Sequence, residues 1–292
     1  MRDYLLMTRW PPKELQVFKD ILVHIPTERP ARPIIDGSVS LAAGLNAHLE
    51  AVSAGYVTTN VAYMIGAAVA SMFEAERERA VKRAETVLAE FESEAKKAGI
   101  SYACRPMGET ASDAGKKVSA IARLFDLNIV LQPDPEQSTF DNDIPREVLF
   151  YSGGPVLFLP HVHRGTFEGR RIGICWDGSR VAARALRDAA PFLPRAESIS
   201  IVTVNHADTA IDEGSAESLV KRLERAGLSA RVIALTAARS DIQPTILSLA
   251  ADENFDLLVM GGYGHSRLQE NFLGGVTRAM LQSMTVPTLM SH

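Results

Sequence analysis

A glycine-rich segment near the C-terminus has the residue types and spacing to bind a phosphate. Gly261 and Gly264 follow an apolar run at 255–259, and Gly274 and Gly275 precede a pattern typical of a helix. Glycines let the backbone approach a ligand closely, and their N–H groups beside a helix N-terminus attract an anion. The spacing alone is equally consistent with a loop that needs glycine only for tight turns.

A second polar turn follows an earlier apolar run in the same half of the chain. Residues 171–175 predict a strand, Asp177 and Gly178 end it, and Ser179 is a suitable N-cap for a helix predicted at 181–193. An acid at this position could bind a nucleoside, or it could simply interact favourably with the helix dipole. The residues themselves leave both roles open.

Strands and helices alternate along the whole second half, which positions these two turns. Further strands are predicted at 198–204, 231–235, 255–259 and 286–290, and further helices at 215–226 and 242–251. This alternation predicts a parallel sheet with helices on both faces. Such sheets bind ligands beyond the carboxyl ends of their strands, so the Asp177 turn and the glycine segment could face one crevice.

The first half repeats this order of signals. Strands are predicted at 20–25, 49–54 and 102–105, and a helix with apolar residues at three-four spacing ends at Gly99. Residues 125–127 repeat 255–257, and Arg146, Leu149 and Pro155 repeat Arg278, Leu281 and Pro287 at one constant offset. We therefore predict a tandem duplication with domains 1–163 and 168–292, joined by a linker near 161–169.

The two halves differ at the glycine segment. Leu131 stands where Gly261 stands, and the run at 132–135, Gln-Pro-Asp-Pro, follows it. Proline lacks the N–H that a phosphate site needs, and Asp134 and Glu136 would repel a phosphate. The first half also carries a match to Asp177-Gly178-Ser179 at Asp36-Gly37-Ser38, with extra residues between it and its strand. We expect the first domain to lack the anion site.

Composition narrows the class of protein. The 292 residues suggest two domains, and a net charge of −4 gives no support to a nucleic-acid partner. The only cysteines, Cys104 and Cys175, do not form a disulfide framework, which favours a reduced, cytoplasmic compartment. The start of the chain lacks the layout of a signal peptide, and the apolar stretch 61–73 is too short to span a bilayer. His161 and His163 have no further ligands at usable spacing, so no metal is expected.

These residues together resemble the universal stress protein family. That family's pattern is Gly, two residues, Gly, nine residues, Gly, then Ser or Thr, and Gly261, Gly264 and Gly274 match it. The turn Trp176-Asp177-Gly178-Ser179 is similar to the family's Val-Asp-Gly-Ser. The resemblance covers nearly all of 171–292 and, more loosely, 17–160.

The resemblance implies a fold and a ligand. The fold is α/β, with two tandem doubly wound, five-stranded, mainly parallel sheets. The two sheets pair through their last strands as an intrachain pseudo-dimer. The resemblance leaves open whether two chains also form a homodimer. The ligand is an adenine nucleotide, ATP or ADP, in the second domain. The residues carried over are Asp177 for the nucleoside, Val204 for the adenine pocket, Met260, Gly261 and Gly264 for ribose and phosphates, and Gly274, Gly275, Val276 and Thr277 as N–H donors to phosphate.

Two residues depart from the family pattern. Gly275 lacks the hydroxyl of the usual Ser or Thr, and one hydrogen bond to a charged oxygen contributes about 1.5–3 kcal/mol. Thr277 is a candidate substitute donor. Trp176 is larger than the usual aliphatic residue, and it could either stack on the adenine or fill its pocket.

Three functions follow from the resemblance. The first is a cytoplasmic universal stress protein in which nucleotide occupancy regulates protein partners that the sequence does not identify, with neither a nucleic acid nor a membrane as partner. The alternative is an interaction scaffold of the same fold that binds no nucleotide, which Gly275 and Trp176 favour. An ATP-consuming enzyme of the related hydrolase folds would need a Ser-Gly-Gly loop after the first strand, which is absent. No Walker A sequence is present either, so slow ATP hydrolysis is the most we expect.

Overall fold

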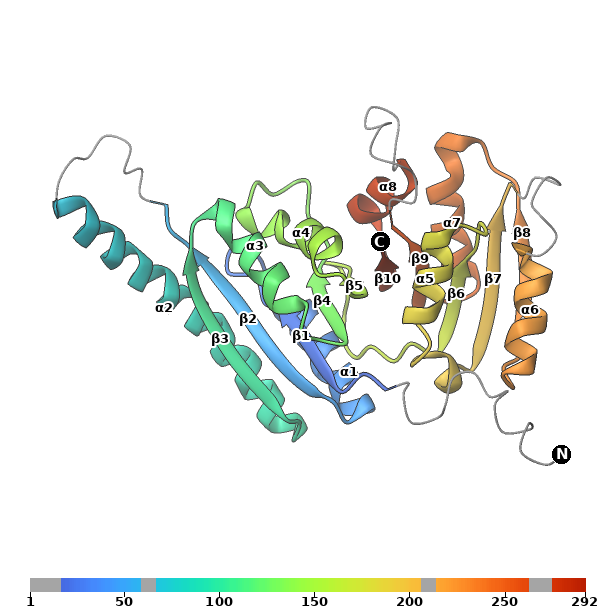
Figure 1. Cartoon of the computed structure of the whole chain (residues 1–292), viewed down its shortest axis with the longest axis horizontal. Helices are drawn as coiled ribbons and strands as arrows, with labels where there is room; N and C mark the ends of the chain where they lie inside the picture. Colours follow the sequence, from blue (N-terminus) through green and yellow to red (C-terminus); the bar gives the residue numbers. More distant parts are fainter. Residues whose placement is uncertain (1–16, 59–66, 206–213, 263–274) are drawn as a thin grey trace, which may run out of the picture.

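The computed structural model describes residues 17–58, 67–205, 214–262 and 275–292 (Figure 1). In these residues ten strands form one continuous sheet in the order β3-β2-β1-β4-β5-β10-β9-β6-β7-β8. The first five strands in the chain fill one half of the sheet, and the last five fill the other half.

The N-terminal half contains β1 to β5 and α1 to α4. The strands are β1 (Asp20–His24), β2 (His48–Tyr56), β3 (Tyr102–Glu109), β4 (Leu127–Leu131) and β5 (Val156–Leu159), and the helices are α1 (Arg32–Leu45), α2 (Ala67–Ala98), α3 (Ala111–Ala122) and α4 (Ile144–Tyr151). Every residue of β4 and β5 is buried, as expected for central parallel strands covered on both faces. The long α2 runs past the edge strand β3 (Figure 1).

The C-terminal half contains β6 to β10 and α5 to α8. The strands are β6 (Arg171–Cys175), β7 (Ser198–Val204), β8 (Arg231–Leu235), β9 (Leu257–Gly261) and β10 (Thr288–Ser291), and the helices are α5 (Arg180–Asp188), α6 (Ala216–Arg225), α7 (Ile242–Asp252) and α8 (Gly275–Ser283). Ser179 and Ser215 cap α5 and α6, because each side chain accepts a hydrogen bond from a backbone N–H in the first turn.

The two halves meet through their last strands. β5 and β10 pair antiparallel, with Leu157 opposite Leu289 and Val156 opposite Met290, whereas the other strand pairs are parallel. The predicted pseudo-dimer of two five-stranded, mainly parallel sheets is therefore confirmed, and it forms one sheet rather than two.

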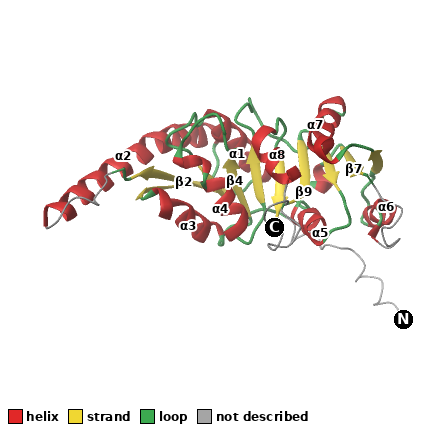
Figure 2. Cartoon of the chain, turned by 90° about the horizontal axis from the view of Figure 1, so that it is seen from above, coloured by secondary structure: helices red, strands yellow, loops and turns green. Residues whose placement is uncertain are grey.

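Helices cover both faces of the sheet (Figure 2). Side chains from α1, α2, α5 and α6 pack into one apolar cluster, which includes Phe91 and Leu186. Side chains from α3, α4, α7 and α8 pack into a second cluster, which includes Val148 and Met280. Alternate strand residues supply the two clusters, since Leu257 lies in the first and Leu258 in the second. We call them the α1/α5 face and the α4/α8 face.

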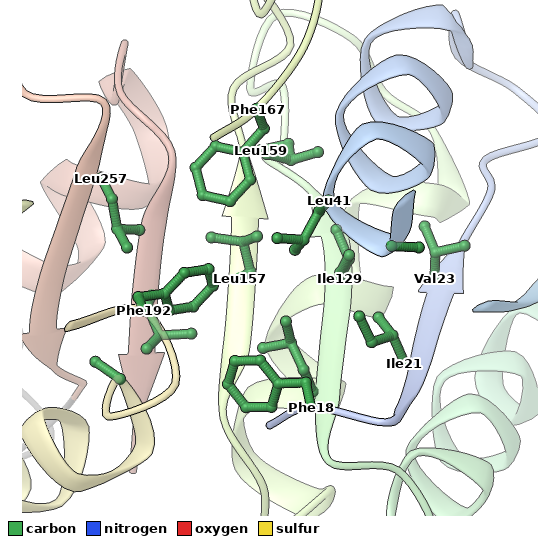
Figure 3. Close-up of a cluster of buried hydrophobic side chains, with 14 of the residues drawn as sticks. Phe18, Ile21, Val23, Leu41, Ile129, Leu157, Leu159, Phe167, Phe192 and Leu257 are labelled. Atoms are coloured by element: carbon green, nitrogen blue, oxygen red, sulfur yellow. The ribbon is translucent and has the colours of Figure 1, made fainter. Parts of the chain in front are cut away.

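An aromatic seam joins the halves on the α1/α5 face (Figure 3). Phe192, which follows α5, packs edge-on against Phe18 ahead of β1, with ring centroids 5.4 Å apart. It also contacts Phe167 of the connecting segment at 6.1 Å. All three rings are buried beside Leu157 of β5. Aromatic pairs in this geometry add to the burial of apolar area, so the seam holds the halves together.

Some element boundaries differ from those expected. α5 ends at Asp188 rather than at residue 193, because Pro191 disfavours helical geometry in the residue that precedes it. β2 and β3 are longer than predicted. The suggested match of Asp36-Gly37-Ser38 to the Asp177 turn is wrong, because these residues lie inside α1. Gly37 there allows α1 to approach β5: a Cβ on it would come within 2.6 Å of Leu159 Cδ1.

Among the helices that the structure describes, none is both long enough and apolar enough to cross a membrane.

Candidate functional site

The carboxyl ends of three neighbouring strands bring the predicted residues of the second half together. β6 lies between β7 and β9, with Cys175 opposite Val202 and Ile174 opposite Val259. Asp177 just beyond β6, Val204 at the end of β7 and Gly261 at the end of β9 therefore lie at one edge of the sheet. α8 begins at Gly275, so Val276 and Thr277 lie in its first turn.

The apolar members of the predicted set lie on one face of that edge. Val204, Met260 and Val276 all belong to the apolar cluster of the α4/α8 face, and Met260 is only 5% exposed. Cys175, which the sequence did not single out, lies in the same cluster. It is the last residue of β6, so the parity of the strand could have identified it. These four side chains form what we call the apolar floor.

The Asp177 turn has a defined local structure. Asp177 Oδ1 accepts a hydrogen bond from the backbone N–H of Ser179 at 2.9 Å, and Gly178 adopts a left-handed φ of +72°. Ser179 Oγ in turn accepts from Ala182 N at 3.2 Å. The Asp177 side chain is exposed at the edge of the apolar floor. It thus supports the start of α5, as one of its two expected roles required, and presents a carboxylate to solvent.

Cys175 provides a neutral group beside that carboxylate. Burial raises the pKa of its thiol to about 12, and the charge of Asp177 adds to the effect. The thiol is therefore protonated at physiological pH, and the apolar floor carries no charge at this position.

Trp176 lies on the opposite face of the sheet from the apolar floor. Its ring packs against the cluster of the α1/α5 face, and its Nε1–H donates to the carbonyl of Gly214 at 2.9 Å. Neighbouring strand residues point to opposite faces, so Cys175 rather than Trp176 joins Val204 and Met260. The large ring therefore does not lie on the apolar floor.

The glycines of the segment have different structural requirements. A Cβ on Gly261 would come within 2.6 Å of Val181 Cγ2 and 2.8 Å of Ala182 N, so glycine is needed where β9 passes the start of α5. A Cβ on Gly275 would meet none of the described residues within 4 Å. No described residue therefore excludes a serine or threonine at the position where this chain departs from the family pattern. Thr277, the suggested substitute donor, is buried.

Two of the predicted site residues, Gly264 and Gly274, lie outside the residues that the structure describes.

The equivalent edge of the N-terminal half is filled by the protein's own side chains. Arg29, only 6% exposed, donates through Nη1 to the carbonyl of Gln132 at 2.7 Å and to Asn142 Oδ1 at 3.2 Å. Asp141, 2% exposed, accepts from the Tyr56 hydroxyl and from the backbone N–H of Glu28, each at 2.7 Å. The segment that replaces the glycine segment is thus bonded to the loop after β1.

Electrostatics in this network follow from its burial. Burial raises the pKa of Asp141 and of Tyr56, and the nearby Asp141 charge raises that of Tyr56 further. Burial lowers the pKa of Arg29, while Asp134 and Asp141 oppose that effect. Attraction between the guanidinium and these carboxylates offsets only part of the cost of burying them, because burial determines the direction of both pKa shifts. The sequence did not indicate Arg29, Tyr56 or Asp141, since their contact depends on tertiary folding.

Comparison with known proteins agrees with this architecture. The sequence model of the Universal stress protein family matches residues 169–292. Those residues belong to the universal stress protein family. No curated protein matches the sequence of the chain.

Solved structures extend the likeness to both halves. A universal stress protein from Archaeoglobus fulgidus DSM 4304 superposes with a TM-score of 0.68 over 92% of this chain and 97% of its own, at 15% identity. A protein of unknown function from Pseudomonas aeruginosa PAO1 gives 0.57 over 94% and 93%, at 14% identity. The cytoplasmic domain of a prokaryotic cation chloride cotransporter gives 0.52 over 94% and 95%, at 14% identity. Both halves of the chain thus share the fold of these proteins, as predicted.

Proposed function

We propose that the chain is a cytoplasmic universal stress protein whose C-terminal domain, residues 168–292, binds ATP or ADP. Occupancy of that site would regulate protein partners in a stress response. The observation that carries the proposal is the convergence of an apolar floor, an exposed carboxylate and a helix N-terminus at one edge of the sheet. This is the edge at which doubly wound sheets bind their ligands.

Each part of the site suits one part of the nucleotide. The apolar floor, which includes Val204 and Met260, offers an adenine ring an uncharged surface. Asp177 would accept hydrogen bonds from ribose hydroxyls, which are donors. The N–H groups of the first turn of α8, from Gly275 to Thr277, would face the phosphates, because a helix N-terminus favours anions. Gly261, Gly264 and Gly274 would let the backbone approach the ligand.

We further propose that the first domain, residues 1–163, binds no nucleotide. The network of Arg29, Tyr56 and Asp141 supports this, since it occupies the edge that corresponds to the apolar floor. The acids Asp134 and Asp141 would also repel phosphate. The first domain would then complete the pseudo-dimer, and the chain would hold one nucleotide.

Substitution of Gly275 tests where the phosphates bind. Gly275→Asp places a carboxylate in the first turn of α8, where no residue that the structure describes lies within 4 Å of a Cβ and the helix dipole favours the charge. We expect the variant to fold as well as the wild type and to lose measurable ATP binding by calorimetry. Adenosine, which has no phosphate, should bind the variant and the wild type equally.

Gly275→Ser is the matched variant at the same position. Its hydroxyl could donate to a phosphate oxygen, so we expect ATP affinity to rise by about tenfold, near the lower end of the 1.5–3 kcal/mol that such a bond contributes. If ATP binds all three proteins with equal affinity, the phosphates do not bind at the first turn of α8. Absence of ATP binding in the wild type would favour an interaction scaffold instead.

A further inference from the structure

The first residue of the glycine segment beyond β9, Gly262, is held at both of its backbone groups. Its N–H donates to the carbonyl of Ser291 at 2.8 Å, and its carbonyl accepts from His292 Nδ1 at 3.1 Å. Both partners lie at the end of β10, the strand that pairs with β5 of the other half. The start of the segment is therefore fixed at the junction of the two halves.

Helix α4 of the N-terminal half packs against this point. A Cβ on Gly262 would lie 3.5 Å from Leu149 Cδ2, and Leu149 is 2% exposed. The next residue, Phe150, meets the ring of His292 edge-on, with centroids 4.9 Å apart and planes at 76°. Leu149 therefore lies beside Gly262, and Phe150 contacts the residue that binds the Gly262 carbonyl.

A polar chain ties the same region to α5. Arg184 donates to the carbonyl of Gly153, just after α4, and pairs with Asp188 at 3.6 Å. Asp188 also accepts from Ser291 Oγ at 2.7 Å, and Ser291 holds the Gly262 N–H. The region around α4 is therefore connected to Gly262 by apolar contacts through Leu149 and Phe150. It is also connected to Gly262 by polar contacts that run from Arg184 through Asp188 to Ser291.

We propose that α4 positions the end of β9, at Gly261 and Gly262, across the junction, with Leu149 and Phe150 as positioning residues for the nucleotide site of the other half. The inference rests on the proposed nucleotide binding. A change that loosens α4 against Gly262 would lower nucleotide affinity without touching the nucleotide. By linkage, occupancy would tighten the contact of α4 with Gly262 and so reach the N-terminal half. The first domain, without a ligand of its own, would then be the part that responds.

Two substitutions probe the contact from its two sides in the full-length chain. Phe150→Ala removes the ring on α4, and His292→Ala removes the ring and the hydrogen bond at the exposed end of β10. Tyr151→Ala is the control, because it removes a half-exposed ring of the same helix that packs against Phe150, with centroids 6.4 Å apart, and leaves the contact of Phe150 with His292 in place. Phe150→Tyr keeps the ring contact and should behave as the wild type.

The first measurement needs no nucleotide. Amide hydrogen exchange at Gly262, followed by NMR, should accelerate in Phe150→Ala and His292→Ala and stay unchanged in Tyr151→Ala. Unchanged exchange in both test variants would overturn the role of α4 in holding the segment, whether or not ATP binds.

The second measurement is ATP affinity by calorimetry. We expect a loss of about fivefold or more in both test variants, the lower range of allosteric coupling, and less than twofold in the control. Faster exchange with unchanged affinity would overturn the coupling. If the wild type binds no ATP, the proposed function is wrong. The hydrogen-exchange data then test by themselves whether α4 holds Gly262 in place.

Discussion

At the scale of single residues, the glycines that suggested a ligand site have separable roles. Gly261 is required by packing, because its Cα lies against the first turn of α5. Gly275 is not required by packing, so its small size there has no steric reason among the described residues. Glycine spacing alone could not separate these roles, since close approach to a helix and close approach to a phosphate need the same residue type.

The role of Gly261 predicts a difference in stability between two matched substitutions. Gly261→Ala puts a Cβ 2.6–2.8 Å from Val181 and from the backbone of Ala182, which must shift. We expect the free energy of unfolding to fall by about 1–3 kcal/mol, the usual cost of overpacking. Gly275→Ala brings its Cβ within 4 Å of no described residue and should cost much less. Denaturant unfolding of both variants measures the difference, and equal stability would refute the packing role.

A buried histidine makes stability depend on pH. Burial, and then the charge of Arg29, lowers the pKa of His24 from 6.5 to about 3. In the unfolded chain the ring titrates near its ordinary value, so the unfolded state binds the proton first as the pH falls. The contribution of His24 to the free energy of unfolding is therefore fully present above about pH 6.5 and is lost as the pH falls towards 3.

The variant His24→Gln should show a shallower loss of stability in acid. Between pH 7 and 4 we expect the wild type to lose about 3 kcal/mol more than the variant, on the basis of its pKa shift. Chemical denaturation at several pH values measures the two slopes. His48→Gln is the control, because His48 lies near the start of β2 with its ring bonded to the Ser101 hydroxyl. Identical slopes for His24→Gln and the wild type would contradict the burial effect.

At the scale of elements, the loop after β1 and the turn before α4 determine what the first half can bind. The loop that replaces the glycine segment is held by Arg29 and Asp141, both buried. Sequence could predict that a phosphate would be repelled there, from Pro133, Asp134 and Glu136. It could not predict the contacts of this loop, because Arg29 and its partners Gln132 and Asn142 are far apart in the chain and meet only in the folded protein.

Loss of Arg29 should destabilise the N-terminal half. Arg29→Ala removes the hydrogen bonds to the Gln132 carbonyl and to Asn142 Oδ1 and leaves Asp134 and Asp141 without a nearby cation. Hydrogen bonds of a charged group contribute about 1.5–3 kcal/mol each, so we expect the free energy of unfolding to fall by at least that range. Arg32→Ala is the matched control, because Arg32 pairs with Asp36 at the surface of α1 and should matter little. Thermal unfolding distinguishes them, and similar melting temperatures would show that the network contributes nothing.

The order of strands and helices could be predicted from the sequence, because the periodic patterns of apolar residues are clear and occur in both halves. Alternating runs predicted the strands of both halves, and the resemblance to the universal stress protein family implied that the last strands would pair. Boundaries were less accessible: Asp36-Gly37-Ser38 resembles a turn but continues as α1, because packing against Leu159 selects the glycine. The face on which Trp176 lies followed only from the register of β6.

At the scale of the whole molecule, the two halves share a fold and differ in their exposed edges. The C-terminal half has the apolar floor beside Asp177, whereas the N-terminal half fills the same edge with charged side chains. One sheet and one aromatic seam join them, so a change in either half can reach the other. In this account one half binds the nucleotide, and the other supports it and presents a surface to partners.

The number of nucleotides per chain tests this account most directly. Isothermal titration of the full-length protein with ATP should give one site per chain, with adenosine competing for it. Arg29→Ala should leave that number at one, since the acids of the first half remain. A stoichiometry of two, or no heat at millimolar ATP, would contradict the account.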